Sequence, residues 1–158
     1  VIPGKIIRFL EQHANVAFAG LRDRDLVPFG HRVSGWSIGA DQRTMTIFFP
    51  NHFTERLIEL LLENGELAVT MGDSGANVTY QLKGRYVSSR PSSEEEYAVQ
   101  ESYKKRIVEG LMQFFPEELA KPIADVESEY RPSIAITFRV EEVFLQTPAP
   151  GAGTKMET

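Results

Sequence analysis

The fold is decided by residues 45–84, which read MTIFFPNHFTERLIELLLENGELAVTMGDSGANVTYQLKG. Residues 44–49 alternate as a half-buried strand does, and apolar residues then recur at helical spacing until Asn64-Gly65, a pair typical of a helix end. Residues 67–71 predict a second strand, 72–75 a turn and 78–87 a third strand. A strand, a helix with a polar start and two more strands thus follow one another closely, an order that can hold a phosphate-bearing cofactor.

The composition is that of one ordinary globular domain. The chain has 158 residues, of which 42% are hydrophobic and 25% charged, and a chain of this length buries roughly 70% of its unfolded surface. The formal net charge of -5 argues against broad binding of nucleic acid or anionic membranes. The absence of cysteine excludes disulfides, thiolate zinc sites and cysteine nucleophiles. We find no membrane-spanning run or secretory signal in the sequence and expect a cytoplasmic protein.

The remaining segments predict an α+β fold. Helices are expected at 3–14 and 117–125, and a long one runs from the overlapping capping boxes at Ser92 and Ser93 to about Phe115. Strands are expected at 16–21, at 27–38 as one strand or a pair, and at 134–145, the last with a bulge at Glu141-Glu142. Short connections between most strands favour a small antiparallel β-barrel of about six strands flanked by helices. Residues 1–146 form the single domain, and 147–158 a tail rich in Pro and Gly.

The third strand of the opening stretch has one polar face. Thr79, Gln81, Lys83 and Arg85 share that face because the side-chain period of a strand is two. The face is either solvated or lines a ligand groove. In the second case Gln81 and Lys83 would donate hydrogen bonds to a heterocycle, a task that suits an amide because it both donates and accepts.

Two further segments offer groups that suit a phosphate or a ring. Residues 51–56 begin a helix with free backbone N–H groups, a hydroxyl, an imidazole and a guanidinium, which is either a phosphate site or an ordinary capped helix start. Residues 30–37 place Arg32, Ser34 and Trp36 on one face of a strand. Trp36 is either a core or interface aromatic or a ligand contact.

The motifs of hydrolytic chemistry are missing from the sequence. His13, His31 and His52 lack metal-ligand spacing, so no metal site is expected. The sequence has no GxSxG, GxGxxG or phosphate-loop pattern. Nucleophilic and metal-assisted hydrolysis are therefore disfavoured.

Taken together, these segments resemble the pyridoxamine 5'-phosphate oxidase-like family of flavin-binding split barrels. The resemblance covers most of the chain and rests on the order of its segments, namely Arg32-Val33, the strand at 44–49, Thr54-Glu55-Arg56, 64–69 and Gln81-Leu82-Lys83-Gly84. It implies a split barrel and a homodimer that binds two FMN molecules at the subunit interface.

The resemblance also implies which residues contact FMN. Arg32 resembles the arginine that reaches the phosphate, and Val33-Ser34 resemble residues whose backbone meets the ring. Phe48, Phe49 and Pro50 match the strand that passes the flavin, Thr54 and Arg56 match phosphate-binding positions, and Gln81 lies near a ring-contacting glutamine. The chain departs from true pyridoxamine phosphate oxidases because its basic pair is thinned to Glu55-Arg56 and the C-terminal substrate-binding arginine and histidine segment is missing.

The leading hypothesis is an FMN-binding oxidoreductase that acts on a small-molecule substrate or electron donor which the sequence does not identify. The alternatives are a deazaflavin- or haem-binding protein of the same fold, or a non-catalytic flavin-binding dimeric module. The tail is either a frayed terminus or a segment that lies across the cofactor cleft or the partner subunit. The second alternative is favoured by its prolines, which lower the entropy cost of ordering, and by its glycines, which permit close backbone approach.

Overall fold

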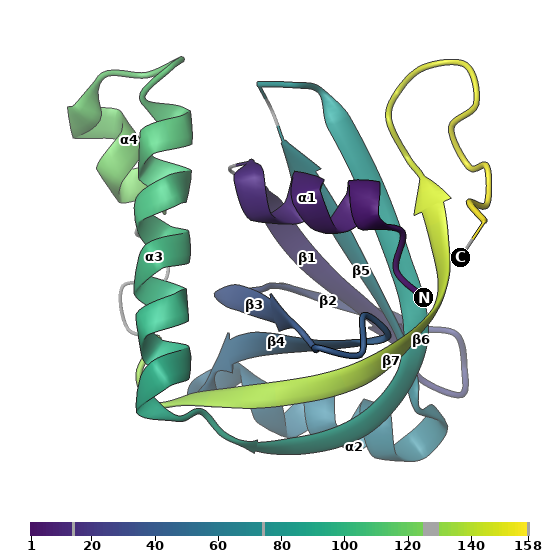
Figure 1. Ribbon diagram of the computed structural model, residues 1–158. Helices are drawn as coiled ribbons and strands as arrows, with labels where there is room; N and C mark the ends of the chain where they lie inside the picture. Colours follow the sequence, from purple (N-terminus) through teal and green to yellow (C-terminus); the bar gives the residue numbers. More distant parts are fainter. Residues whose placement is uncertain (14, 74, 125–129, 158) are drawn as a thin grey trace.

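An antiparallel sheet forms the centre of the molecule and curls around one short helix (Figure 1). The computed structural model describes residues 1–13, 15–73, 75–124 and 130–157. Within these ranges the strands are β1 Val16–Arg22, β2 Pro28–Arg32, β3 Gly35–Ile38, β4 Thr44–Pro50, β5 Glu66–Asp73, β6 Val78–Pro91 and β7 Ser133–Leu145. The helices are α1 Gly4–Gln12, the 3-10 turn η1 Asn51–Phe53, α2 Thr54–Asn64, α3 Glu94–Leu111 and α4 Glu117–Ala124.

The sheet curls into a split barrel whose two outermost strands are joined by a two-residue link. Its strand order is β2-β1-β5-β6-β7-β4-β3, so β2 and β3 are the outermost strands. The link between them is bonded to both sides, since the Val33 N–H donates to the Ala17 carbonyl at 2.9 Å and the Ser34 N–H to the Phe48 carbonyl at 2.8 Å. The predicted α+β split barrel is confirmed, with seven strands in the described residues where about six were expected.

The core fills the inside of this barrel. Along β1, Ala17, Ala19 and Leu21 point inward and are buried, while Phe18 points outward. The inner face is covered by α1 through Ile6 and Leu10, and α2 closes the barrel with its buried leucines, Leu57, Leu60 and Leu61. The left-handed conformation of Gly65 (φ +69°) ends α2 as the sequence predicts.

Helix α3 stands beside the barrel and leads away from it to α4 (Figure 1). It begins with a capping box in which the Ser93 hydroxyl accepts from the Glu96 N–H and the Glu96 carboxylate accepts from the Ser93 N–H. The helix ends at Leu111, earlier than the predicted Phe115, and a turn precedes Pro116, since a residue before proline avoids helical geometry. The predicted helix ends at Ala14 and Asp125 lie outside the described residues.

Strands β6 and β7 form the longest pair in the sheet. Lys83 lies opposite Glu142, whereas Gly84 lies opposite Val140, so Glu141 is an extra residue on β7. This is the bulge that the sequence predicts. None of the helices in the described ranges is long and apolar enough to cross a membrane.

Candidate cofactor site

A row of side chains crosses the outer face of the sheet, opposite to the core. Strand pairing places Phe18 of β1 opposite both Arg32 of β2 and Thr70 of β5. The pairing continues from Thr70 to Gln81 of β6 and from Gln81 to Phe144 of β7. Because paired residues project to the same side of a sheet, these five side chains form one continuous row, which we call the outer row.

A second row runs beside the outer row and ends in charged residues. Its members, in strand order, are Gly30, Gly20, Ala68, Lys83 and Glu142. A Cβ added at Gly20 would meet no atom closer than the Ala68 carbonyl oxygen at 4.0 Å. An open groove of about 410 Å³ lies along Gly20, Ala68 and Lys83. Small residues at this point let a ligand or another chain approach the backbone closely.

The outer row presents an exposed ring and several hydrogen-bond donors. The Phe18 side chain is 53% exposed. The Gln81 amide donates to the Thr70 hydroxyl at 3.0 Å, which orients the amide on the face. The Lys83 ammonium lies 4.6 Å from the centre of the Phe144 ring. A flat ligand would therefore meet aromatic surface, an amide and a cation on one open face.

Arg32 stands at the β2 end of the outer row. Its guanidinium donates to the Ile123 carbonyl at 3.4 Å, a long and weak hydrogen bond. Three strand spacings of about 4.8 Å separate Arg32 from Gln81, about 14 Å in all. This separation suits a ligand that carries an anionic group at one end and a hydrogen-bonding ring at the other.

Five of the residues predicted from the resemblance are buried in the barrel. Val33, Phe48, Phe49, Pro50 and Thr54 have buried side chains. The Thr54 hydroxyl donates to the Asn51 carbonyl at 2.7 Å, within the turn that starts α2. For these residues a contact with a cofactor stays a prediction, and their observed role is to build the barrel wall.

Ser34 is predicted to meet the flavin through its backbone, and the structure engages it inside the protein. Its N–H and its hydroxyl both donate to the Phe48 carbonyl, at 2.8 and 2.9 Å. The hydroxyl also contacts Gln100 of α3 at 2.8 Å. Trp36 is a core residue and packs edge-on against Tyr103 of α3, with ring centres 4.8 Å apart.

Arg56 lies in the first turn of α2 between two carboxylates. Its guanidinium is 3.1 Å from Glu59 and 3.6 Å from Asp23. The Arg56 side chain is half-exposed, and exposed ion pairs contribute about 0–1 kcal/mol. A phosphate could displace them at little cost, so the predicted phosphate role of Arg56 stays open to test.

The C-terminal tail borders the outer row. Lys155 pairs with Phe144, and its ammonium is 2.6 Å from the Glu142 carboxylate. This hydrogen bond and the Lys155 charge hold the pKa of Glu142 below its usual value. Met156 is hydrogen bonded to the Val143 carbonyl at 2.8 Å and packs against the core. The tail is thus folded back onto β7 next to the row.

The sequence missed Phe18, Thr70, Phe144 and Lys155 as members of this face. Residues 16–21 are almost all apolar, so their alternation is hidden and Phe18 reads as a core residue. The register that places Thr70 beside Gln81 joins two strands and is visible only once they pair. No group of three or more metal-binding side chains lies together among the residues that the structure describes.

Comparisons with known proteins find similarity at the level of the fold. No protein-family model and no curated protein sequence matches the chain. HupZ of Group A Streptococcus is similar over 98% of this chain and 99% of its own, with a TM-score of 0.56 and 14% identity.

Two further solved structures are similar over most of their length. A candidate pyridoxamine 5'-phosphate oxidase of Lactobacillus delbrueckii has a TM-score of 0.52 and 10% identity, over 90% of this chain and 92% of its own. An F420 reductase has a TM-score of 0.50 and 10% identity, over 86% and 94%. Together with the curled seven-stranded sheet, these likenesses show that the chain has the split-barrel fold of the pyridoxamine 5'-phosphate oxidase-like proteins, the family that its sequence resembles.

Proposed function

We propose that this protein is an FMN-binding oxidoreductase that works as a homodimer and holds its cofactor over the outer row. The observation that carries the proposal is the register across β2, β1, β5, β6 and β7, which aligns a guanidinium, an exposed ring and an amide on one open face. The fold, which it shares with a candidate pyridoxamine 5'-phosphate oxidase, supports the choice of a flavin.

The residues of the face fit the chemistry of FMN. Arg32 would bind the phosphate through charge-assisted hydrogen bonds, and Arg56 is the second candidate for that role. Phe18 would pack on the ring, while Gln81 and Lys83 would donate to its polar edge. When bound, FMN supplies the transfer of hydride or electrons, so the protein has only to bind, orient and shield.

A second copy of the chain is part of this proposal. The outer row lies on an open face, and the groove beside it is exposed to solvent along Gly20 and Lys83. One protomer therefore covers a planar ligand on one side only. A partner chain would cover the other side, and an interface of this kind buries on the order of 2,000 Å². The small-molecule substrate or electron donor would enter between the two.

The identity of the bound cofactor distinguishes an FMN-binding protein from one that binds deazaflavin or haem. The likeness to an F420 reductase makes a deazaflavin the second candidate. An absorbance spectrum of freshly purified protein, with the mass of the ligand released on heating, distinguishes FMN from deazaflavin and from haem. Light scattering should give about twice the chain mass of 17.8 kDa. A colourless monomer that does not take up added FMN would contradict the proposal, and bound FMN without turnover of NADH or NADPH would favour a non-catalytic module.

Replacing Arg32 by alanine should weaken FMN binding about tenfold to a hundredfold, because a charge-assisted hydrogen bond contributes ~1.5–3 kcal/mol. Fluorescence quenching of FMN measures the affinity. Arg24→Ala is the matched control, since Arg24 is an exposed arginine paired with Glu63 outside both rows. Arg56→Ala, tested in parallel, decides whether the α2 arginine shares the phosphate. Equal affinities of wild type and Arg32→Ala would remove Arg32 from the site.

Replacing Gln81 by alanine should weaken FMN binding less, by about two- to tenfold, since a neutral hydrogen bond contributes ~0.5–1.5 kcal/mol. It should also move the absorbance bands or the reduction potential of the bound flavin, which contacts to the ring tune. Arg32→Ala should leave both unchanged. Thr79→Ala, two residues along the same face of β6, is the control. An unaltered spectrum and potential in Gln81→Ala would place Gln81 away from the ring.

A further inference from the structure

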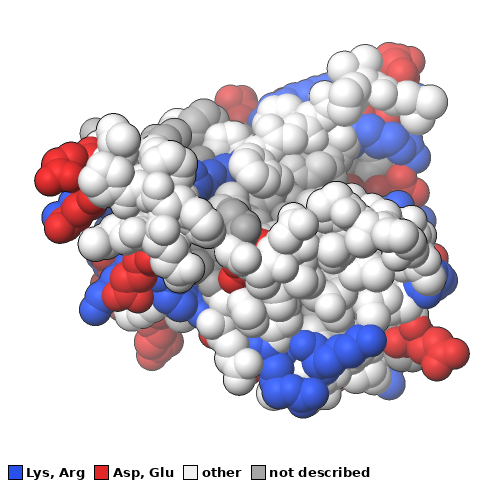
Figure 2. All heavy atoms as spheres, turned by 90° about the horizontal axis from the view of Figure 1, so that it is seen from above, with Lys and Arg blue, Asp and Glu red and all other residues white. Residues whose placement is uncertain are grey.

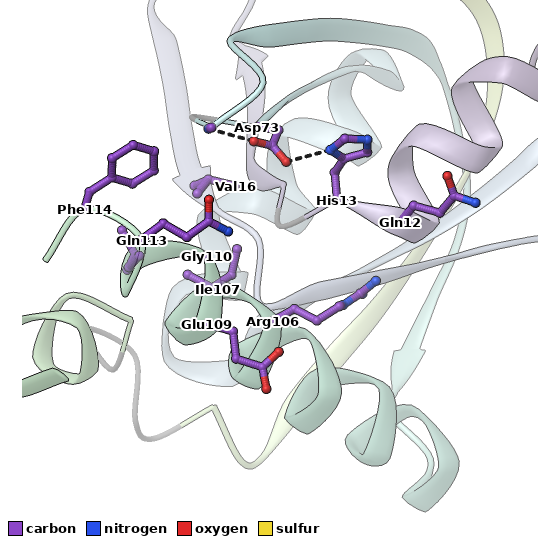
Figure 3. A pocket seen from close by; sticks show the side chains of 12 residues that line it. Gln12, His13, Val16, Asp73, Arg106, Ile107, Glu109, Gly110, Gln113 and Phe114 are labelled. Atoms are coloured by element: carbon purple, nitrogen blue, oxygen red, sulfur yellow. Dashed lines mark hydrogen bonds and ion pairs between the residues drawn. The ribbon is translucent and has the colours of Figure 1, made fainter. Parts of the chain in front are cut away.

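A second cleft lies at the other end of the barrel, between α1, the β5–β6 turn and the end of α3. It has a volume of about 270 Å³ and shares no lining residue with the groove on the outer face. Figure 2 shows the hollow from above, between the barrel and the region of α3 and α4. Figure 3 shows the side chains that line it. His13, the residue that follows α1, lies in this cleft.

The imidazole of His13 is held in place from two sides. Its Nδ1 lies 2.9 Å from an Asp73 oxygen, and its ring stacks on Phe9 with centres 4.8 Å apart. The other Asp73 oxygen accepts the N–H groups of Gly75 and Ala76, at 2.7 and 2.9 Å. Burial raises the pKa of Asp73, but these hydrogen bonds outweigh it and lower the pKa below its usual value. The carboxylate is therefore ionised and accepts from Nδ1.

Arg106 of α3 is the cation of the cleft and is incompletely bonded. Its Nη1 donates to the Glu11 carbonyl at 2.8 Å, while its buried Nε has no hydrogen-bond partner among the described residues. Nε and Nη2 form the edge of a guanidinium that binds a carboxylate through two parallel hydrogen bonds. An unpaired buried donor is costly, and an acceptor at this edge would relieve that cost.

The rest of the cleft is apolar with amides at its rim. Val16, Ile107 and Leu111 line it, and Phe114 is a large apolar side chain that is 58% exposed. Figure 3 shows the Glu109 carboxylate directed away from Asp73 and His13. A ligand here would therefore meet, at one side, a guanidinium edge and an imidazole that is paired with the Asp73 carboxylate, and apolar surface at the other.

We propose that this cleft binds a small organic carboxylate with an apolar body, such as an aromatic acid, whose carboxylate pairs with Arg106. The volume of about 270 Å³ is near the lower end of the range for small-molecule sites, so the ligand is a small one. The site lies apart from the outer row and does not depend on the flavin.

Benzoate is the probe for this site, with benzamide as its uncharged counterpart. In a titration of the ¹⁵N-labelled protein followed by NMR, benzoate should shift the signals of Gln12, His13, Arg106 and Phe114 to saturation, and benzamide should not. The proposal would be overturned if the shifts caused by benzoate do not saturate, or if they are spread over the whole surface. Benzamide or inorganic phosphate binding as tightly as benzoate would also overturn it.

Two variants of Arg106 assign the carboxylate contact. Arg106→Gln should weaken benzoate about tenfold to a hundredfold. Arg106→Lys keeps the charge without the paired donors and should lose most of the same affinity. Lys105→Gln is the control, because it removes one positive charge from the exposed residue that precedes Arg106 in α3. It should change the affinity for benzoate less than twofold. If Lys105→Gln and Arg106→Gln lower the affinity for benzoate equally, the binding reflects only the positive charge of α3, and the proposed site is refuted. The wild-type titration remains decisive if an Arg106 variant does not fold.

Discussion

Gly84→Ala should lower the free energy of unfolding by about 3 kcal/mol, at the upper end of the range for overpacking. A Cβ built on Gly84 would lie 1.9 Å from the Arg139 carbonyl oxygen and 2.8 Å from its carbonyl carbon. Both are backbone atoms of β7, so no flexible side chain can move aside. The position follows the bulge at Glu141, where β6 and β7 come close. Relief of the clash requires the two strands to separate.

Urea unfolding followed by circular dichroism measures this loss, and Gly20→Ala is the matched control. Gly20 is also a strand glycine, but a Cβ there would have 4.0 Å of space to its nearest atom. Gly20→Ala should therefore change stability by less than about 1 kcal/mol, with a small gain from the stiffer unfolded chain. If both variants unfold at the same urea concentration, the close approach of β6 to β7 is not a constraint on the fold.

Gln100→Leu should lower the free energy of unfolding by about 2–3 kcal/mol, because it breaks a buried polar network. Gln100 is 1% exposed and lies on the face of α3 that packs on the barrel. Its amide oxygen accepts from the Ser34 hydroxyl at 2.8 Å, and its amide nitrogen donates to the Ser133 hydroxyl at 2.9 Å. The Ser133 hydroxyl donates in turn to Ser92 at 2.7 Å. Leucine has a similar volume but leaves both serines without their Gln100 partner.

The double variant Ser34→Ala, Gln100→Leu tests the coupling. It should be less destabilised than the sum of the two single variants, because each single variant removes the same Ser34–Gln100 hydrogen bond and the double variant loses it only once. Trp36, the only tryptophan in the chain, packs on Tyr103 of α3 and reports whether this helix stays docked. Additive losses, with unchanged Trp36 emission in Gln100→Leu, would mean that the network does not hold α3 on the barrel.

The elements of the fold could be predicted from local patterns. The capping box at Ser93, the helix end at Gly65 and the bulge at Glu141 are each encoded within a few residues, and all three are present. The alternation along β6 likewise places Gln81 and Lys83 on one face. These features depend on short-range sterics and hydrogen bonding, which neighbours in the sequence supply.

Contacts between distant segments could not be predicted from local patterns. His13 follows α1 with its side chain 40% exposed, and its pairing with Asp73, sixty positions along the chain, is visible only in the structure. The cofactor contacts expected of Arg32, Val33 and Ser34 stay predictions. What the structure adds is that the barrel turns Arg32 outward and binds the backbone of Val33 and the hydroxyl of Ser34 into its wall.

The sequence by itself determined which segments are strands and helices, their antiparallel character and the polar face of β6, because side-chain period, turn residues and caps are local. Only the tertiary structure decided that Arg32, Phe18, Gln81 and Lys155 share one face, since that depends on the register of strands that meet only when the sheet curls. The carboxylate cleft has the same origin. Its residues come from the ends of α1, β5 and α3, which no pattern in the chain brings together.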